Sequence, residues 1–113
     1  MVSRGEIWWV DLADPAGAEP GFTRPVLVVQ SNAFNRSRIG TVIVVALSSN
    51  MRLAAAPGNV SLSPRKSGLP KESVANLSQI ITLDKQSLRE KAGELSQKTM
   101  QLIDEGIRLV LAV

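Results

Sequence analysis

The sequence predicts a mainly β (α+β) fold, a small and strongly bent antiparallel β-barrel with a C-terminal α-helix. Three observations support this prediction. About five to seven short segments rich in β-branched and aromatic residues are separated by turn residues. A helical period appears only near the end of the chain, and a length of 113 residues suits one hydrophobic core. With no internal repeat or interdomain linker, we expect residues 1–113 to form one domain.

The strand predictions follow from local patterns. Segments 25–30 and 41–47 are almost continuously apolar, which is typical of strands that are buried on both faces. Residues 32–36 predict a turn or a single helical turn, and 63–71 predict a loop rich in Pro, Gly and Lys. The complete set of expected strands is 6–12, 25–30, 41–47, 59–62, 74–83 and a last short one near 91–95.

A helix is expected over residues 97–112, with Ser96 as its N-cap. The period separates a polar stripe (Gln101, Asp104, Glu105, Arg108) from an apolar one (Met100, Ile103, Ile107, Val110, Leu111). Leu102 and Leu109 widen the apolar surface, and they belong either to the core or to a contact with a second subunit. Gly106 costs about 1 kcal/mol in a helix interior relative to Ala, so we expect close packing there.

Composition excludes several kinds of chemistry. The chain has neither His nor Cys, so disulfides, thiolate metal sites and the usual His or Cys catalysis are ruled out, and no metal or other cofactor is expected. We find no secretion signal and no run of about 18 apolar residues, so we expect a cytoplasmic protein without a membrane partner. The formal charge of +3 is compatible with a nucleic-acid partner and equally with an ordinary solvated surface.

The segment 17–25 (GAEPGFTRP) joins the first two predicted strands. Pro25 biases the preceding residue towards extended geometry, so we expect Arg24 to be held at the mouth of a strand. A guanidinium fixed in this way binds phosphate through forked hydrogen bonds. Arg24 is therefore the first candidate for a functional residue, although an arginine before a strand is also a common surface residue.

Five segments in order resemble the MazF/PemK family, the toxins of bacterial toxin–antitoxin pairs. They are residues 5–12 (GEIWWVDL), 17–19 (GAE), 24–32 (RPVLVVQSN), 46–49 (ALSS) and 77–85 (LSQIITLDK). With the terminal helix, this resemblance covers essentially the whole chain.

The resemblance implies a homodimeric, SH3-like barrel that acts as a sequence-selective, metal-independent endoribonuclease. Such enzymes cleave single-stranded RNA by attack of a ribose 2′-OH on the adjacent phosphate, which leaves 2′,3′-cyclic phosphate and 5′-OH ends. It also implies a cognate antitoxin, whose disordered acidic segment is expected to fold onto the basic groove and block it.

Three residues fall on the family's catalytic positions. Arg24 would stabilise the extra charge of the transition state, and Ser48 would donate a hydrogen bond to a phosphate oxygen. Glu19 would orient Arg24 or accept the proton of the 2′-OH. Ordinary structural roles remain open for Ser48 as a turn residue, where a shift of one position would exchange it with Ser49, and for Glu19 as a solvated loop residue.

Further residues are candidates for RNA binding: Phe22, Thr23, Ser49, Asn50, Arg52 and Gln79. Two positions depart from the family pattern. Ile81 replaces an arginine, and Phe22 stands where the loop usually has Gly, either to stack on an unpaired base or to cover the groove. Phe34 is expected in the core. Trp8 and Trp9 should face opposite sides of their strand, one in the core and one at a surface or subunit contact.

Two other functions remain open at this point. Relatives with the same barrel poison DNA gyrase by binding and cut nothing, and a catalytically inactive barrel used for protein binding is the third alternative. The presence of Arg24, Glu19 and Ser48 together at the motif positions favours the endoribonuclease.

Overall fold

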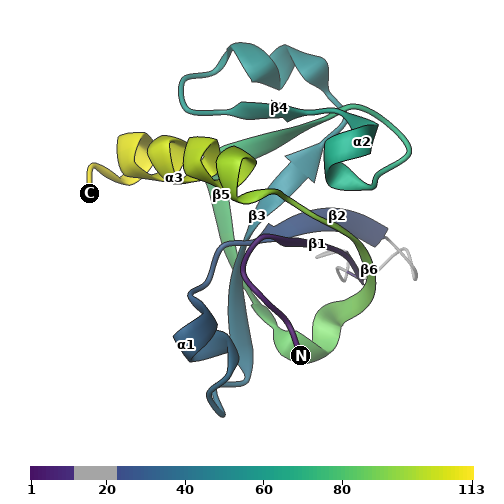
Figure 1. Ribbon diagram of the computed structural model, residues 1–113, viewed down its shortest axis with the longest axis vertical. Helices are drawn as coiled ribbons and strands as arrows, with labels where there is room; N and C mark the ends of the chain where they lie inside the picture. The colour runs from purple at the N-terminus through teal and green to yellow at the C-terminus, as the bar shows by residue number, and fades with distance from the viewer. Residues whose placement is uncertain (12–22) are drawn as a thin grey trace, which may run out of the picture.

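The computed structural model describes residues 1–11 and 23–113, and in them six strands form one antiparallel sheet (Figure 1). The strand order is β4-β5-β3-β2-β1-β6. The strands are β1 (Glu6–Asp11), β2 (Thr23–Val28), β3 (Thr41–Ser48), β4 (Val60–Leu62), β5 (Ser73–Asp84) and β6 (Leu88–Glu94).

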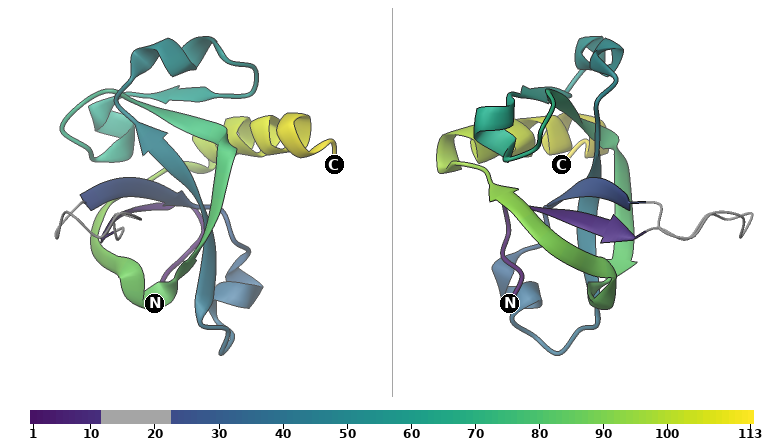
Figure 2. Two further views of the ribbon diagram at one scale, coloured as in Figure 1. Left: turned by 180° about the vertical axis from the view of Figure 1, so that it is seen from behind. Right: turned by 90° about the vertical axis from the view of Figure 1, so that its right-hand side faces the viewer.

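The sheet curls into a half-barrel, and Figure 2 shows from two further sides how the β1–β6 end bends back. Irregularities in pairing lie between Val45 and Ala46, where β3 meets β5, and on β1 where it meets β6. Such irregularities increase local twist and bend a strand. The C-terminal helix α3 (Gln97–Leu111) packs on β4 and β5. The predicted bent antiparallel barrel with a terminal helix is therefore confirmed.

Apolar side chains fill both faces of the central strands. Leu27, Leu47 and Ile103 belong to a cluster between the sheet and α3, whereas Val26 and Val44 belong to a second cluster on the opposite face. Alternate residues of β2 and β3 enter the two clusters, as the pleat requires. The predicted burial on both faces thus holds for residues 26–28 and 44–47, whereas Thr41 and Ile43 at the start of β3 are exposed.

Some elements differ from the prediction. β2 begins at Thr23 and not at residue 25, which places Arg24 inside the strand. β6 begins at Leu88, earlier than predicted, because its charged residues suit an edge strand and hide the strand pattern. The segment expected as a loop contains the short helix α2 (Pro64–Ser67). Further short helices are α1 (Asn32–Asn35) and the 3-10 helices η1 (Met51–Ala55) and η2 (Lys85–Ser87).

The predicted cap of α3 is confirmed, since the Ser96 hydroxyl accepts a hydrogen bond from the Thr99 N–H at 3.1 Å. The predicted apolar stripe is only partly correct. Val110 and Leu111 are exposed because they lie in the last turn, beyond the sheet that the helix covers in Figure 1. Leu102 and Leu109 are 47% and 62% exposed, so neither belongs to the core of this chain.

The aromatic residues divide as follows. Trp8 packs against the valine-rich cluster and Trp9 against the cluster between the sheet and α3, which confirms that they face opposite sides of β1. Both are half-buried, so the expected division into one core and one surface residue is not seen. The prediction for Phe34 was wrong: its side chain lies on the short helix α1 and is 57% exposed. Among the residues that the structure describes, no helix is both long enough and apolar enough to span a membrane.

Candidate active site

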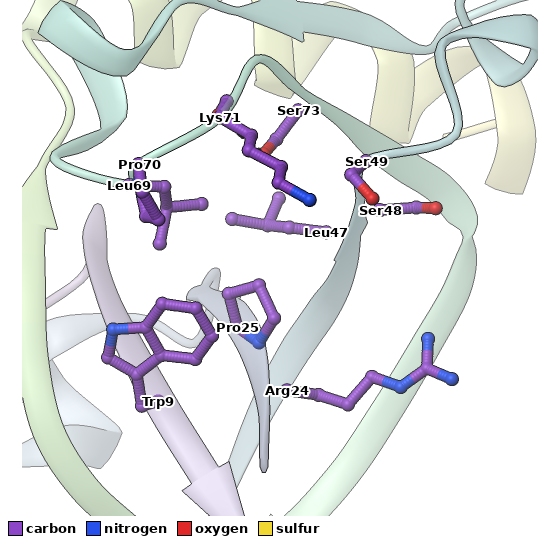
Figure 3. Close-up of a pocket in the computed structure, with 10 residues that line it drawn as sticks. All are labelled: Trp9, Arg24, Pro25, Leu47, Ser48, Ser49, Leu69, Pro70, Lys71 and Ser73. Carbon is purple, nitrogen blue, oxygen red and sulfur yellow. Dashed lines mark hydrogen bonds between the residues drawn. The ribbon is translucent and has the colours of Figure 1, made fainter.

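A cavity of about 280 Å³ opens where β2 and β3 separate (Figure 3). We call it the Arg24 cavity. Its lining residues are Trp9, Arg24, Pro25, Leu47, Ser48, Ser49, Leu69, Pro70, Lys71 and Ser73. They come from β1, β2, β3 and the bend after it, β5 and the loop that follows α2, so the curl of the sheet is what assembles the cavity.

The strand pairing explains why the cavity forms at this place. β2 pairs with β3 only as far as Val26 opposite Ala46, so Arg24 and Ser48 each lie two residues beyond the last pair. On its other side β2 stays paired with β1, where Arg24 lies opposite Val10. The backbone of Arg24 is therefore fixed by its pairing with β1, while its side chain lies at the gap between β2 and β3, where the cavity opens. Figure 3 shows its guanidinium and the Ser48 hydroxyl extending to the same side.

Ser48 is held by a local hydrogen bond. Its Oγ accepts from the Asn50 N–H at 3.1 Å, and the hydroxyl proton remains for donation to a bound oxygen. The Asn50 side chain in turn accepts from the Arg52 N–H at 3.2 Å and caps η1. Ser49 also lines the cavity, whereas Asn50 and Arg52 are exposed and are not among its lining residues.

The other predicted site residues lie as follows. Thr23 begins β2 and donates to an Asp11 carboxylate oxygen at 3.5 Å, and that carboxylate also pairs with Arg89 at 2.7 Å. Gln79 is exposed in the irregular part of β5 and does not line the cavity. Glu19 and Phe22 lie outside the described residues, so their predictions stay predictions.

Several lining residues were not predicted as parts of the site. Trp9, Pro25, Leu47 and Leu69 provide an apolar floor, and Lys71 provides a second cationic group across the cavity from Arg24. The only sequence signal for Lys71 was its place at the end of the loop expected over 63–71. Residues 1–11 and 23–113 contain no group of three or more carboxylates close enough to hold a metal ion.

The chemistry of this cavity is that of phosphate binding next to an apolar surface. A guanidinium and an ammonium group attract phosphate oxygens, and serine hydroxyls donate further hydrogen bonds. The fold and the site together define a small β-barrel suited to bind a phosphodiester.

Comparison with known proteins assigns this barrel to a family. Residues 3–111 match the family described as PemK-like, MazF-like toxins of type II toxin–antitoxin systems. Endoribonuclease MazF6 of Mycobacterium tuberculosis is 46% identical over 111 residues, which cover 98% of this chain and 97% of the relative. Endoribonuclease EndoA of Bacillus subtilis is 36% identical over 113 residues, 100% of this chain and 97% of the relative.

Solved structures agree with this assignment. An endoribonuclease in complex with its cognate antitoxin, from a mycobacterial species, has a TM-score of 0.81 at 27% identity, and the match covers 100% of this chain and 97% of that chain. A MazE–MazF complex from Deinococcus radiodurans shares the fold, with a TM-score of 0.81 at 23% identity over 99% and 96% of the two chains.

The chain therefore belongs to the PemK-like, MazF-like toxins of type II toxin–antitoxin systems. The family resemblance and the endoribonuclease toxin function predicted from the sequence are confirmed at the level of this family.

Proposed function

We propose that this chain cleaves single-stranded RNA in the Arg24 cavity, sequence-selectively and without a metal ion. The observation that carries the proposal is the meeting of Arg24 and Ser48, which are distant in sequence, at one opening beside an apolar floor. The substrate supplies the nucleophile, so a chain without His or Cys has the groups that the reaction needs.

In this mechanism the ribose O2′ attacks the adjacent phosphorus and loses its proton to a base. The bond between phosphorus and the 5′-oxygen breaks and the departing oxygen takes a proton from water, which leaves a 2′,3′-cyclic phosphate and a 5′-OH end. Arg24 stabilises the extra negative charge on the phosphate oxygens, and Ser48 donates a hydrogen bond to one of them. We propose Glu19 as the base or as the group that orients Arg24, because it is the carboxylate of the signature loop.

Further contacts to the RNA are proposed for Thr23 and Ser49, which lie next to Arg24 and Ser48. The exposed residues Asn50, Arg52 and Gln79 are proposed to act further along the strand. Phe22 belongs to the signature loop, and we propose that its ring stacks on an unpaired base.

We propose a cognate antitoxin as the partner, because a related endoribonuclease was solved together with its own antitoxin. Its binding segment is proposed to be acidic and disordered, since Arg24 and Lys71 favour an anionic ligand that competes with RNA. Simultaneous binding of labelled RNA and antitoxin would contradict this. We further propose that residues 1–113 form one domain, that the toxin is a homodimer, and that it acts in the cytoplasm, where such an antitoxin would meet it.

The decisive experiment compares wild-type protein with Arg24→Ala on end-labelled, single-stranded RNA in EDTA. We expect discrete cuts with cyclic-phosphate ends, and a loss of about 10²- to 10³-fold in rate for Arg24→Ala. The matched control is Arg36→Ala, which removes an exposed guanidinium next to α1, away from the cavity.

The outcomes separate the alternatives. Equal cutting by the wild type and Arg24→Ala would point to a contaminant or to a site elsewhere. No cleavage of a long and varied RNA would overturn the endoribonuclease proposal and favour a toxin that binds gyrase or an inactive barrel, of which trapped DNA breaks would identify the first.

A further inference from the structure

Lys71 stands on the wall of the Arg24 cavity that faces Arg24. Figure 3 shows its ammonium group reaching over Leu47 towards Ser49, with the apolar floor between the two cations. The residue lies four positions after the end of α2, in the segment that joins that helix to β5.

The backbone before Lys71 is fixed by α2 and its cap. Gly68 ends the helix with φ of 77°, a left-handed conformation that favours glycine. A Cβ at Gly68 would overlap the carbonyl oxygen of Ala92, so α2 lies against the backbone of β6. The next residue, Leu69, is buried, and its N–H donates to the Ser67 hydroxyl at 3.0 Å. The chain therefore enters Lys71 along a defined path.

The backbone after Lys71 is fixed as well. The hydroxyl of Ser73 donates to the Lys71 carbonyl oxygen at 3.2 Å, and Ser73 is itself buried as the first residue of β5. Ser73 pairs with Leu62 of β4, and Val74, the residue after it, pairs with Ser48 of β3. The Lys71 backbone is thus tied to the same strand end that carries Ser48.

The charge of Lys71 has no partner in the part of the chain that the structure describes. The ion pairs there join Arg4 to Asp104, Arg89 to Asp11 and Lys91 to Glu6, and none of these residues lines the cavity. An ammonium group that projects over a cavity beside two serines, and has no carboxylate bound to it, suits a phosphate.

We propose that Lys71 binds a phosphate that flanks the scissile one, so that the RNA strand crosses the cavity from Arg24 to Lys71. The nucleotide between the two phosphates then lies over the apolar floor formed by Trp9, Pro25, Leu47 and Leu69, because an apolar surface suits a base or ribose and not a phosphate. This inference rests on the proposed function, since it takes the scissile phosphate to be bound at Arg24.

A flanking phosphate is bound equally well in the ground state and in the transition state. Losing its partner therefore raises KM and leaves kcat nearly unchanged. A single phosphate contact to single-stranded RNA also contributes about 0.7 to the slope of log affinity against log salt concentration. These two effects are specific enough to test Lys71.

The experiment compares Lys71→Met, Lys71→Arg and the control Lys66→Met, which removes an equal charge from an exposed position of α2 outside the cavity. KM and kcat are measured on an RNA that the wild type cleaves, and affinity is measured at several salt concentrations on the same RNA with a 2′-deoxy nucleotide at the cut. We expect Lys71→Met to raise KM about tenfold and to lower the salt slope by about 0.7. Lys71→Arg should restore both values, and Lys66→Met should resemble the wild type.

Each other outcome has its own meaning. If the wild type cleaves and Lys71→Met matches Lys66→Met in KM and slope, the assignment of Lys71 is wrong while the proposed function stands. A fall in kcat that Lys71→Arg does not restore would also overturn it and indicate a structural role, which thermal unfolding of each variant would reveal. No cleavage by the wild type would contradict the proposed function itself, and with it this inference.

Discussion

At the scale of single residues, the hydroxyl group of Ser48 has two roles, one in the local structure and one in the proposed catalysis. Its Oγ accepts from the Asn50 N–H and so fixes the chain after β3, while its proton is free to be donated to a phosphate. A substitution of Ser48 should affect catalysis much more than folding. The Asn50 N–H is at an exposed position, where water replaces a lost acceptor, so folding depends little on the hydroxyl.

We therefore expect Ser48→Ala to lower kcat by about 10²- to 10³-fold, since one donor to the transition state is lost, and to change thermal stability little. Ser48→Thr keeps the hydroxyl and should retain most of the activity. Ser61→Ala, at an exposed position of β4, is the control. An unchanged kcat in Ser48→Ala would show that the hydroxyl serves only the turn, the alternative that the sequence left open.

Glu6 is a nearly buried carboxylate at the start of β1 and has several donors. It accepts from the Ser3 N–H at 2.8 Å and the Trp8 indole at 3.1 Å, and it pairs with Lys91 at 3.0 Å. Burial raises the pKa of Glu6, but the hydrogen bond from Ser3 and the contacts with Lys91 and Trp8 lower it more, so the net pKa is below the ordinary value.

A carboxyl group whose pKa is lower in the folded state stabilises the fold above its unfolded pKa and loses this contribution as the pH falls through its folded pKa. We expect the midpoint of urea unfolding to decline in this acidic window for the wild type. Glu6→Gln should have a lower midpoint at pH 7 and a flatter decline. Glu72→Gln, at an exposed position, controls for loss of a carboxylate, and parallel pH profiles for Glu6→Gln and the wild type would contradict the role of Glu6.

At the scale of elements, helix α3 contacts the turn before β4 at two glycines, Gly106 of the helix and Gly58 of the turn. A Cβ on Gly106 would overlap the carbonyl oxygen of Gly58 and would come within 3.1 Å of the Leu77 side chain. The close packing expected at Gly106 from the sequence is confirmed. The contact is between backbones, so a small movement of side chains does not relieve it.

Gly106→Ala is therefore expected to destabilise the protein by about 1–3 kcal/mol, the usual range for overpacking. Its sign is informative, because Gly→Ala in an unobstructed helix stabilises by about 1 kcal/mol. Gln101→Ala, at an exposed position of the same helix, should change the unfolding free energy little. A stabilised Gly106→Ala in chemical denaturation would mean that α3 does not approach Gly58 this closely.

Individual elements also show how much of the fold and of the site can be predicted from the sequence. The apolar runs of β2 and β3 and the Ser96 cap are strong local signals. Ser48 is the last residue of β3, as expected, whereas Arg24 is the second residue of β2 and lies inside the strand rather than before it. The cavity itself depends on where β2 stops pairing with β3, which is a consequence of the curl of the sheet and has no local signal. Helix α2 was not predicted because Ser63-Pro64 and Gly68, although typical of a helix start and end, enclose only one turn.

At the scale of the whole molecule, α3 presents apolar side chains that this chain leaves uncovered. Leu102 and Leu109 lie in the same groove, between α3 and the turn before β4, where their exposure makes them available for a second copy. Full burial of a leucine contributes about 1.5–3 kcal/mol, and a symmetric dimer contains each position twice.

If the proposed homodimer uses this surface, the double variant Leu102→Ser/Leu109→Ser should weaken self-association at least about a hundredfold, since each 1.4 kcal/mol is a factor of ten. Sedimentation over a range of protein concentrations measures this directly. Both residues are exposed in the single chain, so the fold of the monomer should persist. The control is Phe34→Ser, which removes an equally exposed apolar side chain from α1. If the Phe34→Ser variant dissociates while the leucine double variant stays dimeric, the proposal is wrong. The apolar area that holds the dimer together would then lie on α1 and not on α3.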